Sequence, residues 1–150
     1  MSLPSALPAE AQAFLDLLNG YRAQNGLAVL QPDAVLQAAA EWLSADMLAN
    51  CVAAGTECGH TDSTGRAPFQ RLSDFGYPVS ASYAENLFWG PADAAGSAGQ
   101  ALDHWQQSAE QNRNQLNSAF VAIGIAGTCS DAGCAWVAVF GSRVVQPLGQ

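Results

Sequence analysis

The sequence predicts an α+β domain in which a small antiparallel sheet lies between helical layers. Hydrophobic residues in the first half recur at helical spacing, whereas the last third carries two apolar runs joined by a turn. Helices followed by strands in this order are typical of α+β proteins. A chain of 150 residues, 49% of them hydrophobic, is long enough to bury one core. We therefore expect an N-terminal arm at 1–9, one domain at 10–145 and a C-terminal tail at 146–150.

Two amphipathic helices are predicted at the start of the domain. From Glu10 to about Gln24, apolar residues recur every three or four positions, and Asn25-Gly26 ends the pattern. Pro32-Asp33 opens the second helix, which ends near Asn50-Cys51. Its apolar stripe is rich in alanine, so we expect it to pack closely against its neighbour.

The middle of the chain is expected to alternate between loops and short elements. Residues 52–65 are small and polar, which favours a loop. Pro68 begins a short helix, and Gly76-Tyr77-Pro78 ends it. The apolar run at 84–90 then predicts a strand that begins at a carboxylate, Glu85.

The last part of the chain is expected to contain a helix and a hairpin. Apolar spacing predicts the helix at 97–109, and the Asn- and Gln-rich stretch at 110–118 suggests a turn. Two apolar runs, 120–126 and 135–141, then form antiparallel strands around a turn that carries two cysteines.

The four cysteines form two local pairs, Cys51 with Cys58 and Cys129 with Cys134. We expect two disulfides and therefore an oxidising, extracytoplasmic compartment. Zinc held by Cys51, Cys58 and His60 is a lower-ranked alternative, because a fourth ligand is missing nearby. The first three residues lack signal-peptide features, so we expect an added start on a secreted mature chain whose signal peptide has been removed.

The net charge of the chain excludes some classes of binding partner. The chain has 13 acidic residues, five arginines and no lysine, for a net charge of −8. Such a surface repels phosphate backbones, so we expect no nucleic-acid partner. No apolar run approaches the roughly twenty residues of a membrane-spanning helix, and we expect a monomer.

Two motifs carry the candidate chemistry. His60 lies in a loop of small residues, and Glu85 stands beside an amide at the start of the predicted strand. A neutral imidazole and a carboxylate in one site suit acid–base catalysis or a divalent metal. The alternative is a loop histidine and a carboxylate that caps a backbone amide.

Four stretches in order give the chain a family likeness. They are Leu18–Leu27 followed by Leu36 and Ala39, His60–Gly65 running on to Pro68–Leu72 and Gly76-Tyr77, Ala84–Leu87 with Gly90, and a last stretch through Trp105, Ser108, Asn114, Leu116 and Ile123–Ile125. With these residues the chain resembles the CAP superfamily, also called the SCP/PR-1-like or cysteine-rich secretory domain, in its bacterial secreted form. The resemblance implies an α-β-α sandwich.

The resemblance also implies a cleft with two histidines and one or two glutamates, where some family members bind zinc. His60 matches the first histidine and Glu85 the glutamate of the Glu-Asn motif. Gln111 stands at the second histidine position, and Ser108 stands where many eukaryotic members have a second glutamate. Because a carboxamide is a poor zinc ligand, zinc or another divalent cation is disfavoured, with His60 as its tentative ligand.

One further hypothesis is that His104 supplies the second imidazole of the cleft from a different position. His104, Ser108 and Gln111 would share one helix face if the helix continued through Gln111, which would bring His104 into the cleft. The alternative is that His104 is solvated beside Asp103.

Three functions remain open from the sequence. The first is a secreted binding module whose cleft, lined by His60, Glu85, Ser108 and Gln111, accepts a small molecule, a lipid or a cell-surface ligand. The second is a hydrolase or metal-dependent enzyme with His60 and Glu85 as its catalytic residues. The third is an extracellular scaffold with a vestigial site. The incomplete residue set favours the binding module over the enzyme.

Overall fold

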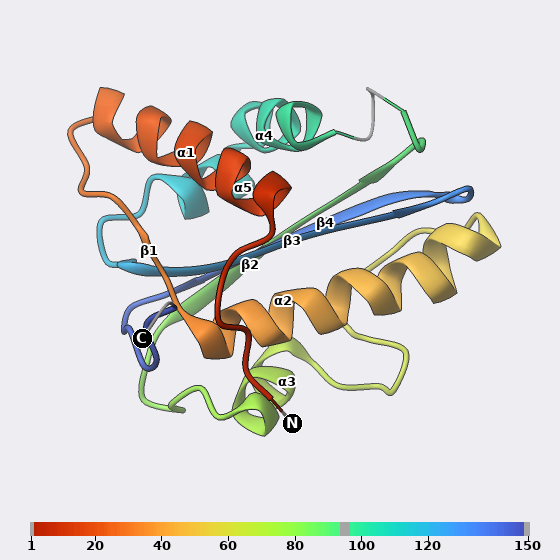
Figure 1. Ribbon diagram of the computed structural model, residues 1–150, viewed down its shortest axis with the longest axis horizontal. Helices are drawn as coiled ribbons and strands as arrows, with labels where there is room; N and C mark the ends of the chain where they lie inside the picture. The colour runs from red at the N-terminus through yellow and green to blue at the C-terminus, as the bar shows by residue number, and fades with distance from the viewer. Residues whose placement is uncertain (1, 94–96, 149–150) are drawn as a thin grey trace.

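The computed structural model describes residues 2–93 and 97–148. In these ranges, helices and strands follow one another in the order that Figure 1 shows. Their bounds are α1 Ala9–Gln24, β1 Gln31–Pro32, α2 Ala34–Met47, the π-helical turn η1 Leu48–Val52, α3 Pro68–Phe75, β2 Tyr83–Gly90, α4 Ala98–Gln107, α5 Ala109–Gln115, β3 Ala122–Ser130 and β4 Gly133–Gly141.

The four strands form one sheet in the order β1-β3-β4-β2. The three long strands pair antiparallel, and the two-residue β1 pairs parallel with β3, so the sheet is mixed. Helices α2 and α3 lie on one side of the sheet, while α1, α4 and α5 lie on the other (Figure 1). The predicted layered α+β architecture is confirmed, with one short parallel strand that the sequence pattern did not reveal.

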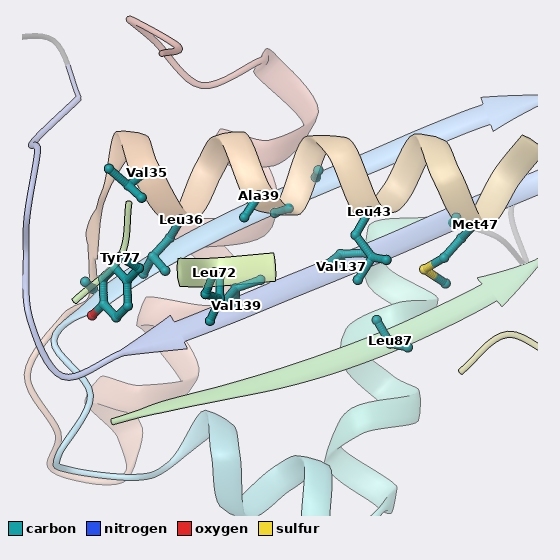
Figure 2. Close-up of a cluster of buried hydrophobic side chains, with 14 of the residues drawn as sticks. Val35, Leu36, Ala39, Leu43, Met47, Leu72, Tyr77, Leu87, Val137 and Val139 are labelled. Atoms are coloured by element: carbon teal, nitrogen blue, oxygen red, sulfur yellow. The ribbon is translucent and has the colours of Figure 1, made fainter. Parts of the chain in front are cut away.

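Helix α2 packs unusually close to the sheet. A methyl group added at Gly124 of β3 would clash with the backbone oxygen of Leu36, so only glycine permits this approach. The buried side chains of α2 include four alanines, and Figure 2 shows Leu36, Ala39 and Leu43 pointing toward the strands. The predicted alanine-rich packing face is therefore the face that contacts the sheet.

The opposite face of the sheet holds an aromatic cluster. The Phe14 ring of α1 lies 5.4 Å from the Trp105 ring of α4 and 5.5 Å from the Trp136 ring of β4. Trp136 lies across Gly127, where an added methyl group would come within 2.5 Å of the indole. The glycine thus makes room for the tryptophan at the centre of this layer.

Two expectations about helix ends are corrected. The helix predicted at 97–109 ends at Gln107, because Ser108 is extended (φ −96°, ψ 121°). The stretch predicted as a turn at 110–118 instead begins within helix α5, where the Ser108 hydroxyl caps the N–H group of Gln111. The second helix ends close to the predicted position, because α2 continues through η1 to Val52.

Asp33 connects the start of α2 to the end of the chain. Its side chain accepts hydrogen bonds from the backbone N–H groups of Val35 and Leu36, which caps the helix. The other carboxylate oxygen accepts from the N–H groups of Val145 and Gln146. The carboxylate is fully buried, so the C-terminal segment is held against the domain.

Both predicted disulfides are present. Cys51 pairs with Cys58, and Cys129 pairs with Cys134 across the tip of the β3–β4 hairpin. Within the described residues, no helix is long and apolar enough to cross a membrane.

Candidate functional site

The fold brings His60 and Glu85 together, although 25 positions separate them. His60 Nδ1 lies 2.9 Å from Glu85 Oε1. The Glu85 carboxylate is 2% exposed and the His60 side chain 54%. Because a carboxylate can only accept, Nδ1 carries the proton, and the Nε2 of neutral His60 keeps its lone pair. The pair is a histidine whose tautomer is fixed by a buried carboxylate.

Arg71 of α3 contacts both the backbone of His60 and the carboxylate that binds its ring. One nitrogen of its guanidinium donates to Glu85 Oε2 at 2.7 Å. The other donates to the backbone oxygen of His60 and to Asp62 Oδ2, both at 3.2 Å. Arg71 is fully buried, so it fixes the imidazole through Glu85 and the loop backbone directly.

Asp62 organises the loop that carries His60. Its Oδ1 accepts from the N–H groups of Thr64 and Arg66 and from the Thr64 hydroxyl, and its Oδ2 accepts from Arg66 and Arg71. Burial alone would raise the pKa of Asp62, but these hydrogen bonds outweigh it and hold the pKa far below its ordinary value. The Arg66 guanidinium also stacks 4.6 Å over the Trp42 ring.

The same loop is fastened to the end of α2. The Cys51–Cys58 disulfide closes one side. On the other side, Asp46 accepts from the N–H group of Ser63 at 2.9 Å and from its hydroxyl. Between these fixed points lies a cavity of about 150 Å³. The disulfide and Asp46 thus restrain the loop that carries His60.

The surroundings of His60 raise the pKa of its imidazole. Its pKa is raised mainly by the hydrogen bond to Glu85; burial and the charge of Arg71 lower it, and the charges of Glu85 and Glu110 raise it. Glu110, in the first turn of α5, therefore acts on the imidazole through its charge. Sequence reasoning gave Glu110 no role.

Gln111 and Ser108 lie at the start of α5, beside β2. Gln111 Nε2 donates to the backbone oxygen of Leu87 at 3.3 Å, the same oxygen that accepts from the Trp105 indole at 2.9 Å. Asn86 donates to the backbone oxygen of Gln111 at 3.0 Å. The Ser108 hydroxyl accepts from the Gln111 N–H group. Among the described residues, neither side chain is hydrogen-bonded to His60.

His104 does not meet the condition set for a second imidazole. The helix breaks at Ser108, so His104 and Gln111 belong to different helices. His104 instead lies against the Phe88 ring, with ring centres 5.2 Å apart. Nor can Cys51 and Cys58 serve as free zinc ligands, because they are joined to each other.

The residues present do not fit a zinc site of the kind that the family resemblance implies. Among residues 2–93 and 97–148, no three His, Cys, Asp or Glu side chains are grouped closely enough to hold a metal ion. Both oxygens of Glu85 are engaged by protein donors, and the Gln111 amide donates to β2.

Sequence reasoning missed Arg71, Asp62 and Glu110 as parts of the site. The sequence holds a weak signal for Arg71. It directly precedes the inward-facing Leu72, and the few arginines of the chain are scattered and form no basic patch. Periodicity alone does not distinguish a buried arginine from a solvated one.

The family model for the cysteine-rich secretory protein family (CAP) matches residues 15–140. The chain belongs to this family. No protein with a curated description matches it by sequence.

Solved structures agree with this CAP fold. An outer surface protein of Borrelia burgdorferi superimposes with a TM-score of 0.75 at 21% identity, over 95% of this chain and 99% of that one. An extracellular SCP-domain protein of Bacillus anthracis gives 0.73 at 23% identity, over 89% of this chain and 40% of its own. A zinc-containing structure of NaASP2 gives 0.62 at 14% identity, over 98% and 88%. These identities establish the fold alone.

Proposed function

We propose that this CAP domain is an extracellular binding module and that His60 is the centre of its ligand site. The proposal rests on one observation: an exposed imidazole is fixed in one tautomer by a buried carboxylate, and Arg71 holds both the carboxylate and the histidine backbone. A preorganised polar group loses little entropy on binding. The two disulfides, and the extracellular or outer-surface description of two structural relatives, support an extracellular location.

The site favours ligands that offer a hydrogen-bond donor. Above its raised pKa, His60 is neutral and presents the Nε2 lone pair, and the charge of Glu110 also favours a donor. A ligand hydroxyl or amine would satisfy both groups. A small molecule, a lipid headgroup or a cell-surface ligand can supply such a donor.

Histidine-detected NMR tests this proposal directly, because the chain has two histidines. A panel of small alcohols, amines and amides would be titrated while the ring signals of His60 and His104 are followed. We expect saturable shifts at His60, while His104 serves as the internal control. Binding should weaken in His60→Gln, whereas His104→Gln should bind as the wild type does. Equal binding to both variants would exclude a His60 site and leave the scaffold alternative.

Zinc binding is the test of the metal alternative. Calorimetric titration of zinc into the wild type should give no tight binding, because one imidazole and an engaged carboxylate do not make a closed site. Tight binding that His60→Ala abolishes would revive the metalloenzyme hypothesis. Gln111→His, measured in parallel, shows whether the second histidine alone restores the site.

A hydrolase is the second candidate, and the His60–Glu85 pair is the observation that favours it. A histidine whose Nδ1–H is bound by a carboxylate is the arrangement of a general base. Ser108 offers a hydroxyl, but that hydroxyl caps α5. Hydrolysis of a model ester should then fall by orders of magnitude in both His60→Ala and Glu85→Gln, and activity that persists in either variant excludes this mechanism.

A further inference from the structure

The sheet has two edges, and the outer edge of β3 is at the one far from the His60 site. In the order β1-β3-β4-β2, His60 contacts the edge strand β2, whereas β3 is bordered by the two-residue β1. A strand edge that is not covered exposes backbone donors and acceptors that can pair with another chain.

Residues at and beside β1 cover the first part of this edge, and the side chain of Gln37 covers the next part. The N–H groups of Gln31 and Asp33 donate to the oxygens of Val121 and Ile123. At Ile125 a side chain takes over: the Gln37 carboxamide donates to the Ile125 oxygen at 2.6 Å and accepts from its N–H group at 2.7 Å. A buried amide thus occupies the place of a neighbouring strand residue.

This pairing shows that Ile125 directs its backbone groups outward, away from β4. Gly127 is two positions further on, and the pairing with β4 continues without a bulge to Ser130. Backbone groups alternate in direction along a strand, so the N–H and C=O of Gly127 also point outward. The 4.1 Å Cα separation of Cys129 and Cys134 agrees, because it is the short spacing of a pair without mutual backbone bonds. No described residue hydrogen-bonds to these two groups of Gly127.

A groove lies in front of Gly127. Its volume is about 280 Å³, and it is lined by the first residues of α1 with Pro8, by Glu41 of α2 and by Ala126–Thr128 of β3. Its charged groups are the carboxylates of Glu10 and Glu41. Helices α1 and α2 cover opposite faces of the sheet (Figure 1), so the two carboxylates flank the edge from both sides.

We propose that this groove, defined by Gly127, Glu10 and Glu41, binds an extended peptide segment that carries two consecutive basic residues. The peptide backbone would add to β3 at Gly127, as the Gln37 amide already does at Ile125. Successive side chains of an extended peptide point to opposite faces, so adjacent basic residues would reach Glu10 and Glu41 separately. A chain of net charge −8 that contains no lysine complements such a partner.

The test uses the peptide acetyl-Thr-Val-Lys-Lys-Val-Thr-amide, titrated into the ¹⁵N-labelled domain with its disulfides intact. We expect a saturable shift of the Gly127 amide signal at millimolar peptide. The isomer acetyl-Thr-Lys-Val-Lys-Val-Thr-amide places both lysines on one face and should bind several-fold more weakly. A version with N-methylated backbone amides should leave the Gly127 signal unchanged.

Charge variants complete the test. Glu10→Gln and Glu41→Gln should each weaken binding by about two- to fivefold, as expected for exposed ion pairs. Asp16→Asn, the same change of charge elsewhere on α1, should have no effect. The proposal is overturned by the absence of a saturable Gly127 shift, or by equal binding of the matching diglutamate peptide. It is also overturned if the Gly127 signal shifts with protein concentration alone, since the occupant would then be a second copy of the chain.

Discussion

Replacing Arg71 with methionine removes the cation that joins two buried carboxylates. Methionine keeps much of the apolar stem, so the change isolates the guanidinium and the hydrogen bonds it donates to Glu85, Asp62 and the backbone of His60. Removing one partner of a buried ion pair typically costs about 3–5 kcal/mol, because the remaining charge is left without compensation. Asp62 keeps Arg66 as a partner, whereas Glu85 keeps, among the described side chains, only the partly exposed His60. We therefore expect a loss of about 3–5 kcal/mol, a large part of the stability of a typical domain.

Urea unfolding at pH 7, with an unchanged slope, measures this loss. Arg113→Met is the matched control, because Arg113 is exposed and its replacement should cost less than about 0.5 kcal/mol. The double variant Arg71→Met with Glu85→Gln removes the uncompensated charge and should recover part of the loss. A cost below about 1 kcal/mol for Arg71→Met, or no recovery in the double variant, would refute the view that Arg71 compensates Glu85.

Three other predictions concern pH, packing and capping. The pKa of His60 is raised above 6.5. The contribution of His60 to stability is therefore complete below pH 6.5 and is lost as the pH rises through the folded-state pKa. Urea unfolding midpoints measured from about pH 5 to 9 should show this loss in the wild type and not in His60→Gln. Gly127→Ala forces a methyl group against Trp136, and thermal melts should show that it destabilises the domain by about 1–3 kcal/mol. In the same melts, Gly20→Ala, in an open part of α1, should stabilise the domain by up to about 1 kcal/mol. Asp33→Ala should cost at least about 1–2 kcal/mol and speed proteolysis of the C-terminal segment, and equal cleavage rates would contradict the linkage described above.

The sequence was sufficient for the layered fold and for the two disulfides, because periodicity and cysteine spacing are local signals. It was less informative where the outcome depends on single side chains. Helix α5 was hidden by its Asn- and Gln-rich composition, although Ser108 and Gln111 have the spacing of a capping box. Strand β1 is two residues long and leaves no period to detect.

The candidate site follows the same pattern. The meeting of His60 and Glu85 could be anticipated from a family likeness that linked two distant motifs. Arg71 could not be anticipated, because its role depends on three acceptors that are brought together only when the loop, α3 and β2 have packed.

The contacts of Asp33 have a consequence for how this chain matures. During synthesis the N-terminal residues emerge first, yet the carboxylate that caps α2 is completed by N–H groups 112 and 113 positions later. Until Val145 and Gln146 have emerged, the Asp33 carboxylate lacks two of its protein donors, and water must take their place. The final docking of the domain is therefore expected only after Val145 and Gln146 have been translated and can reach Asp33.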